Sequence, residues 1–254
     1  MTQIALLGYG RMGRILEELA PQREHGIAAI IDPYTEGCLG SISEETLGDA
    51  KVCIDFTHPE VVVENIRRVI ALGRHMVVGT TGWYDRMDEV KQMVEESGTG
   101  LIWSGNFSIG VNAAFRIVEA AARIFNNLSD YDVLAHETHH RHKADSPSGT
   151  AKMFGKILLD NIDRKTKLVY EMLDRRIEPH ELHFSSSRGG AIPGTHRIAF
   201  DSTVDTIEIT HTARGREGFA VGALMAAEFI DGRVGFYNID DLMKDIVLGS
   251  EQSP

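Results

Sequence analysis

Short apolar runs alternate with helical stretches through the N-terminal part of the chain, and this alternation constrains the fold more than any other feature. The runs predict strands over residues 3–7, 27–31, 51–56, 75–78 and 101–103. Helices are expected around them over residues 10–20, 59–72 and 84–96. A strand, a helix and a second strand in succession pair in parallel through a right-handed crossover. Because the runs are apolar almost throughout, we expect a parallel sheet with helices on both faces.

The pattern changes after Asn106, where we expect a second domain of the α+β class. It begins with a predicted helix, a short strand and another helix, over residues 111–125, 132–137 and 150–162. Strands without intervening helices then follow over residues 181–185, 195–200 and 203–212, which is typical of antiparallel pairing. We interpret the polar stretch 185–190 as an ordinary loop, and a mobile lid is the less favoured alternative.

The chain turns helical again over residues 218–230, and the apolar face of this helix needs a partner. We therefore expect the tail to return to the first domain. A length of 254 residues fits one or two domains. The prediction is a first domain made of residues 1–107 and 217–254, with a second domain, residues 108–216, inserted in it.

The turn between the first predicted strand and the first helix has the spacing G-x-G-x-x-G. It consists of Gly8, Tyr9, Gly10, Arg11, Met12 and Gly13. Glycines at this spacing permit a tight turn and the close approach of a pyrophosphate, and the helix N-terminus offers free N–H groups. Asp32 ends the second predicted strand, near the spacing expected for an acid that binds the adenosine ribose. These features predict an α/β fold with a doubly wound parallel sheet of the Rossmann type that binds a dinucleotide.

The residues around Asp32 favour NADH as the cofactor. A carboxylate there accepts hydrogen bonds from both ribose hydroxyls and repels a 2′-phosphate. Pro33 follows it, so no adjacent arginine can take that phosphate. Arg11 could still reach a phosphate, and the use of NADPH therefore stays open.

Four histidines, His136, His139, His140 and His142, lie close together before a predicted helix N-terminus. A zinc site is disfavoured because Arg141 and Lys143 would repel a cation and the thiols are remote, so we expect no metal. Solvated loop histidines are a second interpretation. The third is an anion site with an acid: the amides of Ser148, Gly149 and Thr150 can hold a carboxylate, while Lys143 and a histidine add positive charge and a transferable proton.

Charge and composition limit the partners. With 26 basic and 37 acidic side chains the net charge is −11, which argues against binding to nucleic acid or to an anionic membrane. No apolar run reaches the length of a membrane span, and the first residues do not have the pattern of a secretory signal. Two cysteines, Cys38 and Cys53, suit a reducing compartment, so we expect a cytoplasmic protein.

Several motifs together resemble the 4-hydroxy-tetrahydrodipicolinate reductases, also called dihydrodipicolinate reductases. They are the glycine turn through Arg14, Asp55-Phe56-Thr57, Gly79-Thr80-Thr81-Gly82, Asn106-Phe107-Ser108, the run from Glu137 to Ala151, and Phe219-Ala220-Val221-Gly222-Ala223. The run E-x-H-H-x-x-K-x-D-x-P-S-G-T is highly specific, whereas the glycine turn is not. The resemblance implies reduction of a cyclic dicarboxylate by NADH or NADPH on the diaminopimelate route to lysine. It also implies a homotetramer, built by strands of the substrate-binding domain, residues 108–216.

The resemblance also implies the roles of individual residues. His139 is the expected proton donor and Lys143 a second catalytic cation, with His140, Gly149 and Thr150 at the substrate. The residues expected to line the cofactor are Gly79, Thr80, Thr81, Ser104, Gly105, Asn106 and Phe107. Some relatives carry an arginine where this chain has Pro33, which weighs against strong use of NADPH. Two alternatives stay open: another amino-acid-pathway dehydrogenase on the same architecture, and an NADH-binding regulator, for which we find no basic segment.

Overall fold

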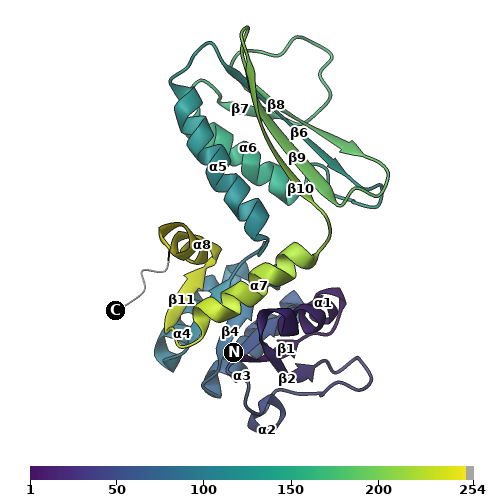
Figure 1. Ribbon diagram of the computed structural model, residues 1–254, viewed down its shortest axis with the longest axis vertical. Coiled ribbons are helices and arrows are strands. Elements are labelled where there is room, and N and C mark those ends of the chain that lie inside the picture. Colours follow the sequence, from purple (N-terminus) through teal and green to yellow (C-terminus); the bar gives the residue numbers. More distant parts are fainter. Residues whose placement is uncertain (250–254) are drawn as a thin grey trace. The chain divides into compact units, whose positions relative to one another are not determined.

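The computed structural model describes residues 1–249, which fold as two compact units (Figure 1). Unit 1 contains Met1–Ile109 together with the chain from Arg216 onward, and unit 2 contains Gly110–Gly215. The sequence predicted domain boundaries between residues 107 and 108 and between residues 216 and 217. The last five residues of the predicted range 217–254 lie outside the described residues.

Unit 1 is built on a six-stranded sheet in which every neighbouring pair is parallel. Its strands are β1 (Gln3–Leu7), β2 (Gly26–Ile31), β3 (Val52–Asp55), β4 (His75–Val78), β5 (Gly100–Trp103) and β11 (Gly235–Asn238), in the order β11-β5-β4-β3-β1-β2. The five strands expected from apolar runs are present within one residue at each end, and β11 was missed. The order reverses at β1, so the loops after β1 and β3 meet at a switch point of a doubly wound sheet.

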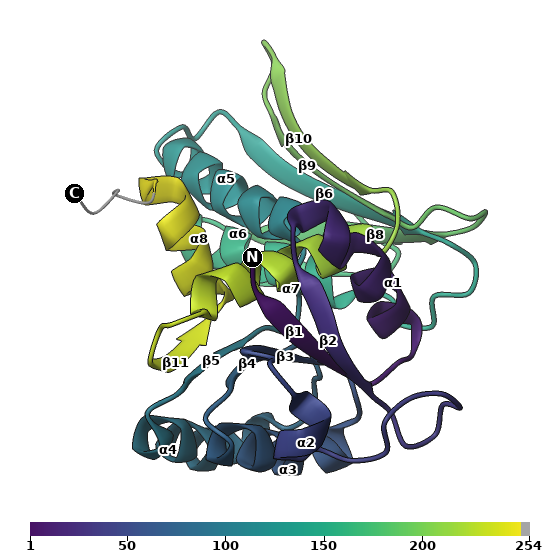
Figure 2. The same ribbon diagram turned by 60° about the horizontal axis from the view of Figure 1, so that its bottom comes forward.

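Both faces of this sheet are apolar because alternate strand residues point to opposite sides. Residues such as Ala5, Cys53 and Met76 pack against α2 (Glu44–Leu47), α3 (Pro59–Ala71) and α4 (Met87–Ser97). Their neighbours, such as Ile54 and Val77, pack against α1 (Arg11–Leu19), α7 (Glu217–Ile230) and α8 (Ile239–Leu248). Figure 2 shows α2, α3 and α4 together on one side of the strands. The C-terminal elements α7, β11 and α8 thus belong to the same core as the N-terminus. Two short 3-10 turns complete unit 1, at Ala20–Arg23 and Tyr84–Arg86.

Unit 2 has a five-stranded mixed sheet with two helices on one face. Its strands are β6 (Asp132–His139), β7 (Lys167–Val169), β8 (Glu181–Arg188), β9 (Gly194–Asp201) and β10 (Thr206–Ala213), in the order β10-β9-β6-β8-β7. The helices are α5 (Ile109–Asn126) and α6 (Gly149–Asn161), and they cover a core that includes Val118, Phe154 and Phe184. None of the described helices is both long and apolar enough to cross a membrane.

Three expectations for unit 2 are wrong in detail. First, only the pairs β6–β9 and β9–β10 are antiparallel. Strands β7 and β8 run parallel to β6, because helix α6 and the chain after it cross back before β7 begins. Residues 185–188 belong to strand β8 and are not a loop, since β6 pairs with them along their whole length. Strand β6 likewise continues to His139, which therefore lies on the sheet rather than in the following loop. In the last two cases pairing inside the sheet overrides a weak local strand propensity.

Candidate active site

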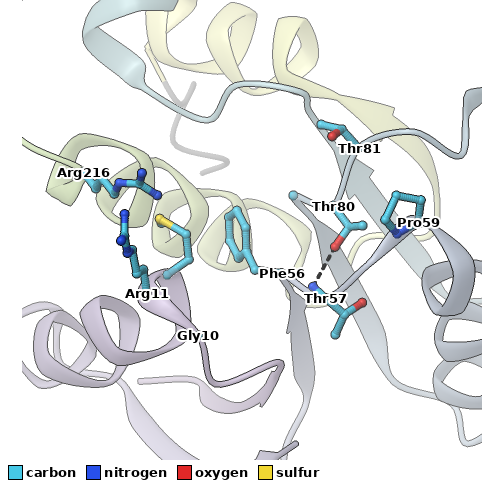
Figure 3. Close-up of a pocket in the computed structure, with 10 residues that line it drawn as sticks. Gly10, Arg11, Phe56, Thr57, Pro59, Thr80, Thr81 and Arg216 are labelled. Carbon is cyan, nitrogen blue, oxygen red and sulfur yellow. Dashed lines mark hydrogen bonds between the residues drawn. The ribbon is translucent and has the colours of Figure 1, made fainter. Parts of the chain in front are cut away.

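A cavity of about 280 Å³ opens at the carboxyl ends of strands β1, β3 and β4 in unit 1 (Figure 3). It is lined by Gly10, Arg11, Met12, Phe56, Thr57, Pro59, Gly79, Thr80, Thr81 and Arg216. Six of these were expected to contact a cofactor, whereas Phe56, Thr57, Pro59 and Arg216 were not. The side chains of Arg11 and Arg216 extend toward each other at one end of the cavity, and none of the ten described residues that line it carries a carboxylate. An anionic ligand therefore suits the cavity.

The glycines of the first turn fit a bound pyrophosphate. Gly8 has a φ of +88°, and a Cβ there would lie 2.6 Å from the carbonyl oxygen of Phe56. A Cβ on Gly13 would lie 2.3 Å from the carbonyl oxygen of Gly8, so both positions require glycine. Gly10 is different, because nothing lies within 4 Å of its added Cβ and no side chain caps α1 there. Its open space lies next to the free N–H groups of a helix N-terminus, where a phosphate group can bind.

Asp32 holds the glycine turn in place. Its carboxylate accepts hydrogen bonds from the N–H groups of Tyr9 (2.7 Å) and Tyr34 (2.9 Å). Burial by itself would raise the pKa of Asp32, but these N–H groups lower the pKa below its usual value, so the side chain is ionised at neutral pH. The ribose-binding role stays a prediction; the support of the turn was not anticipated.

A buried carboxylate, Asp55, ties together two loops that form the cavity wall. It accepts hydrogen bonds from the Thr57 hydroxyl (2.7 Å), the Thr80 hydroxyl (2.6 Å) and the Asn65 amide (2.9 Å). The Thr57 N–H in turn donates to the Thr80 hydroxyl oxygen at 2.8 Å (Figure 3). Burial raises the pKa of Asp55, and its hydrogen bonds partly oppose that effect. Sequence analysis assigned no role to Asp55 or Asn65, because the network depends on strand order.

The loop after β5 lies beside the same wall. A Cβ on Gly105 would lie 3.9 Å from the Thr81 methyl group and 3.0 Å from the Tyr84 hydroxyl. The Ser104 hydroxyl donates to the carbonyl oxygen of Asn106 at 2.8 Å, and Phe107 is buried. The structure thus brings the predicted residues 104–107 next to Thr81, although they do not line the cavity itself.

In unit 2 the core face of the sheet changes from apolar to polar near the N-terminus of α6. Glu137 on β6 pairs in register with Ser186 on β8 and with His196 on β9. His139, two residues further along β6, pairs with Arg188. Since cross-strand partners point to the same side, these five side chains form one group, which we call the Glu137 cluster. Only His139 among them was given a role from the sequence.

His139 is buried at the end of β6, and its ring lies against a glycine. A Cβ on Gly194 would lie 2.9 Å from His139 Nε2. The Nδ1 atom lies 3.3 Å from Glu137 Oε2, and the His196 ring is 5.2 Å away between centroids. Burial lowers the pKa of His139 to about 4, with a smaller opposing effect from Glu137. This pKa is below the ordinary histidine value near 6.5, so the ring is neutral at pH 7 in the free enzyme.

The four histidines expected as a cluster do not share one site. His136 lies on the opposite face of β6 from His139, where its ring contacts the hydroxyls of Ser185 (2.8 Å) and Thr138 (3.0 Å). The N–H of His140 donates to the carbonyl oxygen of Ile192 at 2.7 Å, and its ring lies 6.3 Å from that of His142.

Lys143 and the helix N-terminus provide the positive charge and free donors near this end of β6. Lys143 Nζ lies 2.7 Å from the carboxylate of Asp145, so a substrate carboxylate would have to replace or join that contact. Both the N–H and the hydroxyl of Ser148 donate to Glu137, and the same hydroxyl caps α6 by accepting from Ala151 N–H. In the described part of the chain, the N–H groups of Gly149 and Thr150 have no partner and can hold an anion.

Glu137, His139 and His196 also place one nitrogen or oxygen each within 4.8 Å of one another, as metal ligands would. The Glu137 carboxylate, however, already accepts from Ser148, Ser186 and Arg188, and the positive charge of the Arg188 guanidinium disfavours a cation beside it. The absence of a metal stays our prediction.

The parallel sheet with its glycine turn and the second, mixed sheet are typical of a class of oxidoreductases that have a Rossmann-type nucleotide-binding domain. Family comparison is more specific. The family described as "Dihydrodipicolinate reductase, N-terminus" matches residues 2–107, and "Dihydrodipicolinate reductase, C-terminus" matches residues 110–243. The chain belongs to the dihydrodipicolinate reductase family, and it is an oxidoreductase.

Full-length relatives support this assignment. The chain is 37% identical over 245 residues to a 4-hydroxy-tetrahydrodipicolinate reductase of Christiangramia forsetii, covering 96% of this chain and 98% of the relative. It is 35% identical over 273 residues to the enzyme of that name from Pseudomonas fluorescens, covering 96% and 99%. The dipicolinate-bound dihydrodipicolinate reductase from Paenisporosarcina has the same fold, with a TM-score of 0.77, 20% identity, and coverage of 94% and 97%.

Proposed function

We propose how this enzyme carries out the reaction of its family, the reduction of 4-hydroxy-tetrahydrodipicolinate to tetrahydrodipicolinate in the diaminopimelate route of lysine biosynthesis. The observation that carries the proposal is the grouping of His139, Lys143 and the free N–H groups of Gly149 and Thr150 at one end of unit 2. An acid, a cation and a helix N-terminus together suit a small dicarboxylate that must be held and protonated.

The cofactor is NADH in this proposal, with NADPH as a poorer alternative. The free N–H groups at the start of α1 hold the pyrophosphate, with Arg11 and Arg216 beside it. Asp32 accepts from the adenosine ribose and disfavours a 2′-phosphate, and Pro33 supplies no counter-charge. Loss of the 4-hydroxyl group of the substrate as water gives a conjugated imine. When bound, the nicotinamide would supply a hydride to this imine, and the electron-rich carbon that results must take a proton.

His139 supplies that proton in our proposal. Its ring is neutral in the free enzyme at pH 7, because burial lowers its pKa to about 4. A dicarboxylate held by Lys143, Gly149 and Thr150 brings negative charge next to the ring, which raises its proton affinity. His139 thus becomes an acid only when the substrate is in place. General-acid help of this kind is worth about 10²–10⁴ in rate.

The decisive experiment measures NADH oxidation at 340 nm with enzymatically generated 4-hydroxy-tetrahydrodipicolinate. We expect saturable, substrate-dependent oxidation, with a KM for NADH no higher than that for NADPH. An NADPH KM more than tenfold lower would contradict the cofactor assignment. No oxidation with either cofactor would contradict the proposed reaction.

We also propose a cytoplasmic homotetramer that assembles through the strands of unit 2. Both cysteines are free, which suits a reducing compartment, and Leu134 on the outer face of β6 is 49% exposed. Light scattering should give a mass near four times 28.1 kDa. A monomeric mass at micromolar concentration would contradict this assembly.

A further inference from the structure

Glu137 occupies a position where the strand pattern requires an apolar side chain. On β6 it follows Val133 and Ala135 along the face that packs against the core, and it is fully buried. A buried carboxylate is costly unless every oxygen is satisfied. We therefore expect Glu137 to have a function that offsets the free-energy cost of burying its charge.

One carboxylate oxygen of Glu137 accepts three hydrogen bonds from the surrounding chain. Oε1 accepts from the Ser148 N–H at 3.0 Å, the Ser186 hydroxyl at 2.8 Å and the Arg188 guanidinium at 2.8 Å. Burial by itself would raise the pKa of Glu137, but hydrogen bonds from His196, Ser148 and Arg188 outweigh it and hold the pKa well below its usual value. The carboxylate is therefore ionised, and as an ion it can only accept hydrogen bonds.

The other oxygen faces two imidazole rings. Besides accepting from the Ser148 hydroxyl, Oε2 lies 3.3 Å from His139 Nδ1 and 3.4 Å from His196 Nε2. The contact with His139 is not a well-formed hydrogen bond, but the buried Nδ1 has no other partner in residues 1–249. The negative charge of Glu137 attracts a proton on Nδ1 and repels a lone pair there, so it favours the tautomer that carries the proton on Nδ1.

We infer that Glu137 is a positioning residue that holds His139 as its Nδ1–H tautomer, so that the transferable proton is carried by Nε2. This inference rests on the proposed role of His139 as the proton donor. Because Nδ1 keeps its proton throughout, the ring gains and loses only the Nε2 proton. The negative charge of Glu137 also stabilises the imidazolium that forms when substrate binds.

The other charged groups around the ring act in the opposite direction. The groups that face His139 or Glu137 come from several elements: Arg188 on β8, His196 on β9, Lys143 in the loop after β6, and Tyr170 after β7. His196, Lys143 and Arg188 each lower the pKa of His139, while Glu137 raises it. Removing the Glu137 charge therefore leaves the ring surrounded by positive charge and harder to protonate.

The tautomer can be read directly from ¹⁵N-resolved NMR of the histidine rings in the full-length enzyme at pH 7.5. The His139→Gln variant assigns the His139 signals, because they are missing from its spectrum. We expect Nδ1–H for His139 in the unmodified enzyme. An Nε2–H tautomer would overturn the inference, and this result does not depend on whether any Glu137 variant folds.

The Glu137→Gln variant tests the electrostatic half of the inference. We expect its kcat–pH profile to move toward lower pH and kcat at pH 7.5 to fall about 10- to 1000-fold, the scale of a lost neighbouring charge. Ser186→Ala is the matched control, because it removes a donor from the other oxygen and leaves the charge in place. It should leave the pH profile where it is.

The role of Glu137 and the proposed function can be contradicted separately. A purely structural role for Glu137 predicts a less stable Glu137→Gln protein whose pH profile is unchanged, and that outcome would overturn the inference. If the unmodified enzyme did not reduce 4-hydroxy-tetrahydrodipicolinate, the proposed function would fail, while the NMR result would still report the tautomer.

Discussion

Each unit buries one carboxylate near the carboxyl end of a central strand, but different donors satisfy the two. Asp55 in unit 1 accepts from neutral groups, the hydroxyls of Thr57 and Thr80 and the amide of Asn65. Glu137 in unit 2 accepts from the Arg188 guanidinium as well as from hydroxyls, and it faces two imidazoles. Burial raises the pKa of Asp55, and its neutral donors oppose that effect only in part; burial acts on Glu137 in the same direction, but hydrogen bonds from His196, Ser148 and Arg188 outweigh it and lower the pKa.

The difference teaches what each carboxylate contributes. Asp55 fixes two loops that line the cavity, and it does so through neutral donors. Glu137 also fixes a helix N-terminus, but its charge acts on His139, the group that we propose as the proton donor. Hydrogen bonds are enough to hold loops in position, whereas shifting the pKa of a neighbouring acid requires an ionised group close to it.

Removing the positive charge of Lys143 should have a large effect on catalysis. For Lys143→Ala we expect kcat/KM to fall about 100- to 1000-fold, because a desolvated charge pair with a substrate carboxylate is lost. Both kcat and KM should worsen, since the cation acts in the ground state and the transition state. Steady-state kinetics would show this, and Lys156→Ala on the exposed side of α6 is the control, with near-normal kinetics expected. A normal KM for Lys143→Ala would exclude a carboxylate contact.

Changes at Asp32 should have an intermediate effect confined to the cofactor. Asp32→Ala should weaken NADH binding by about 1–2 kcal/mol, the scale of hydrogen bonds to a charged group. Because Asp32 also holds the N–H groups of Tyr9 and Tyr34, Asp32→Asn is the sharper variant: it keeps an acceptor for the turn and removes the charge. Fluorescence titration should show a weaker Kd for NADH and a smaller preference over NADPH. Unchanged preference in Asp32→Asn would mean that Asp32 only supports the turn.

The pH dependence of stability should separate the two buried carboxylates, with a slope of at most about 1.4 kcal/mol per pH unit for each. The lowered pKa of Glu137 means that its stabilisation is present above the ordinary glutamate range and is lost as pH falls. The raised pKa of Asp55 gives the opposite sign, so its contribution is lost as pH rises through that pKa. Urea unfolding at pH 3 to 8 of the unmodified protein, Glu137→Gln and Asp55→Asn measures both differences. Equal signs would show that the two sites do not differ as described.

The fold was predictable wherever an apolar run was long enough to be buried. Strands β1 and β4 have the predicted ends, because both their faces are covered. The sequence analysis missed α2, β7, β11 and α8, which are short or have few fully buried residues. The polar end of β8 was also missed, because its Ser185 and Ser187 are strand residues only through their pairing with β6.

The candidate site was predictable only where its residues are contiguous in sequence. His139, Lys143 and the start of α6 belong to one motif, and Asp32 follows the glycine turn at a known spacing. His196, Ser186 and Arg188 come from two other strands, and only the register of β6 with β8 and β9 places them beside Glu137. The depressed pKa of His139 has the same origin, since burial is a property of the fold and not of the motif.

The most direct test of the account is a combined kinetic and binding measurement on the His139→Gln variant. The central claim is that proton donation belongs to unit 2 and cofactor binding to unit 1. We predict a fall in kcat of about 10²–10⁴ with little change in KM, because the proton is needed only in the transition state. NADH titration of the same preparation should give a Kd within a few-fold of the unmodified enzyme. Near-normal kcat together with a collapse of NADH binding would contradict the assignment of both sites.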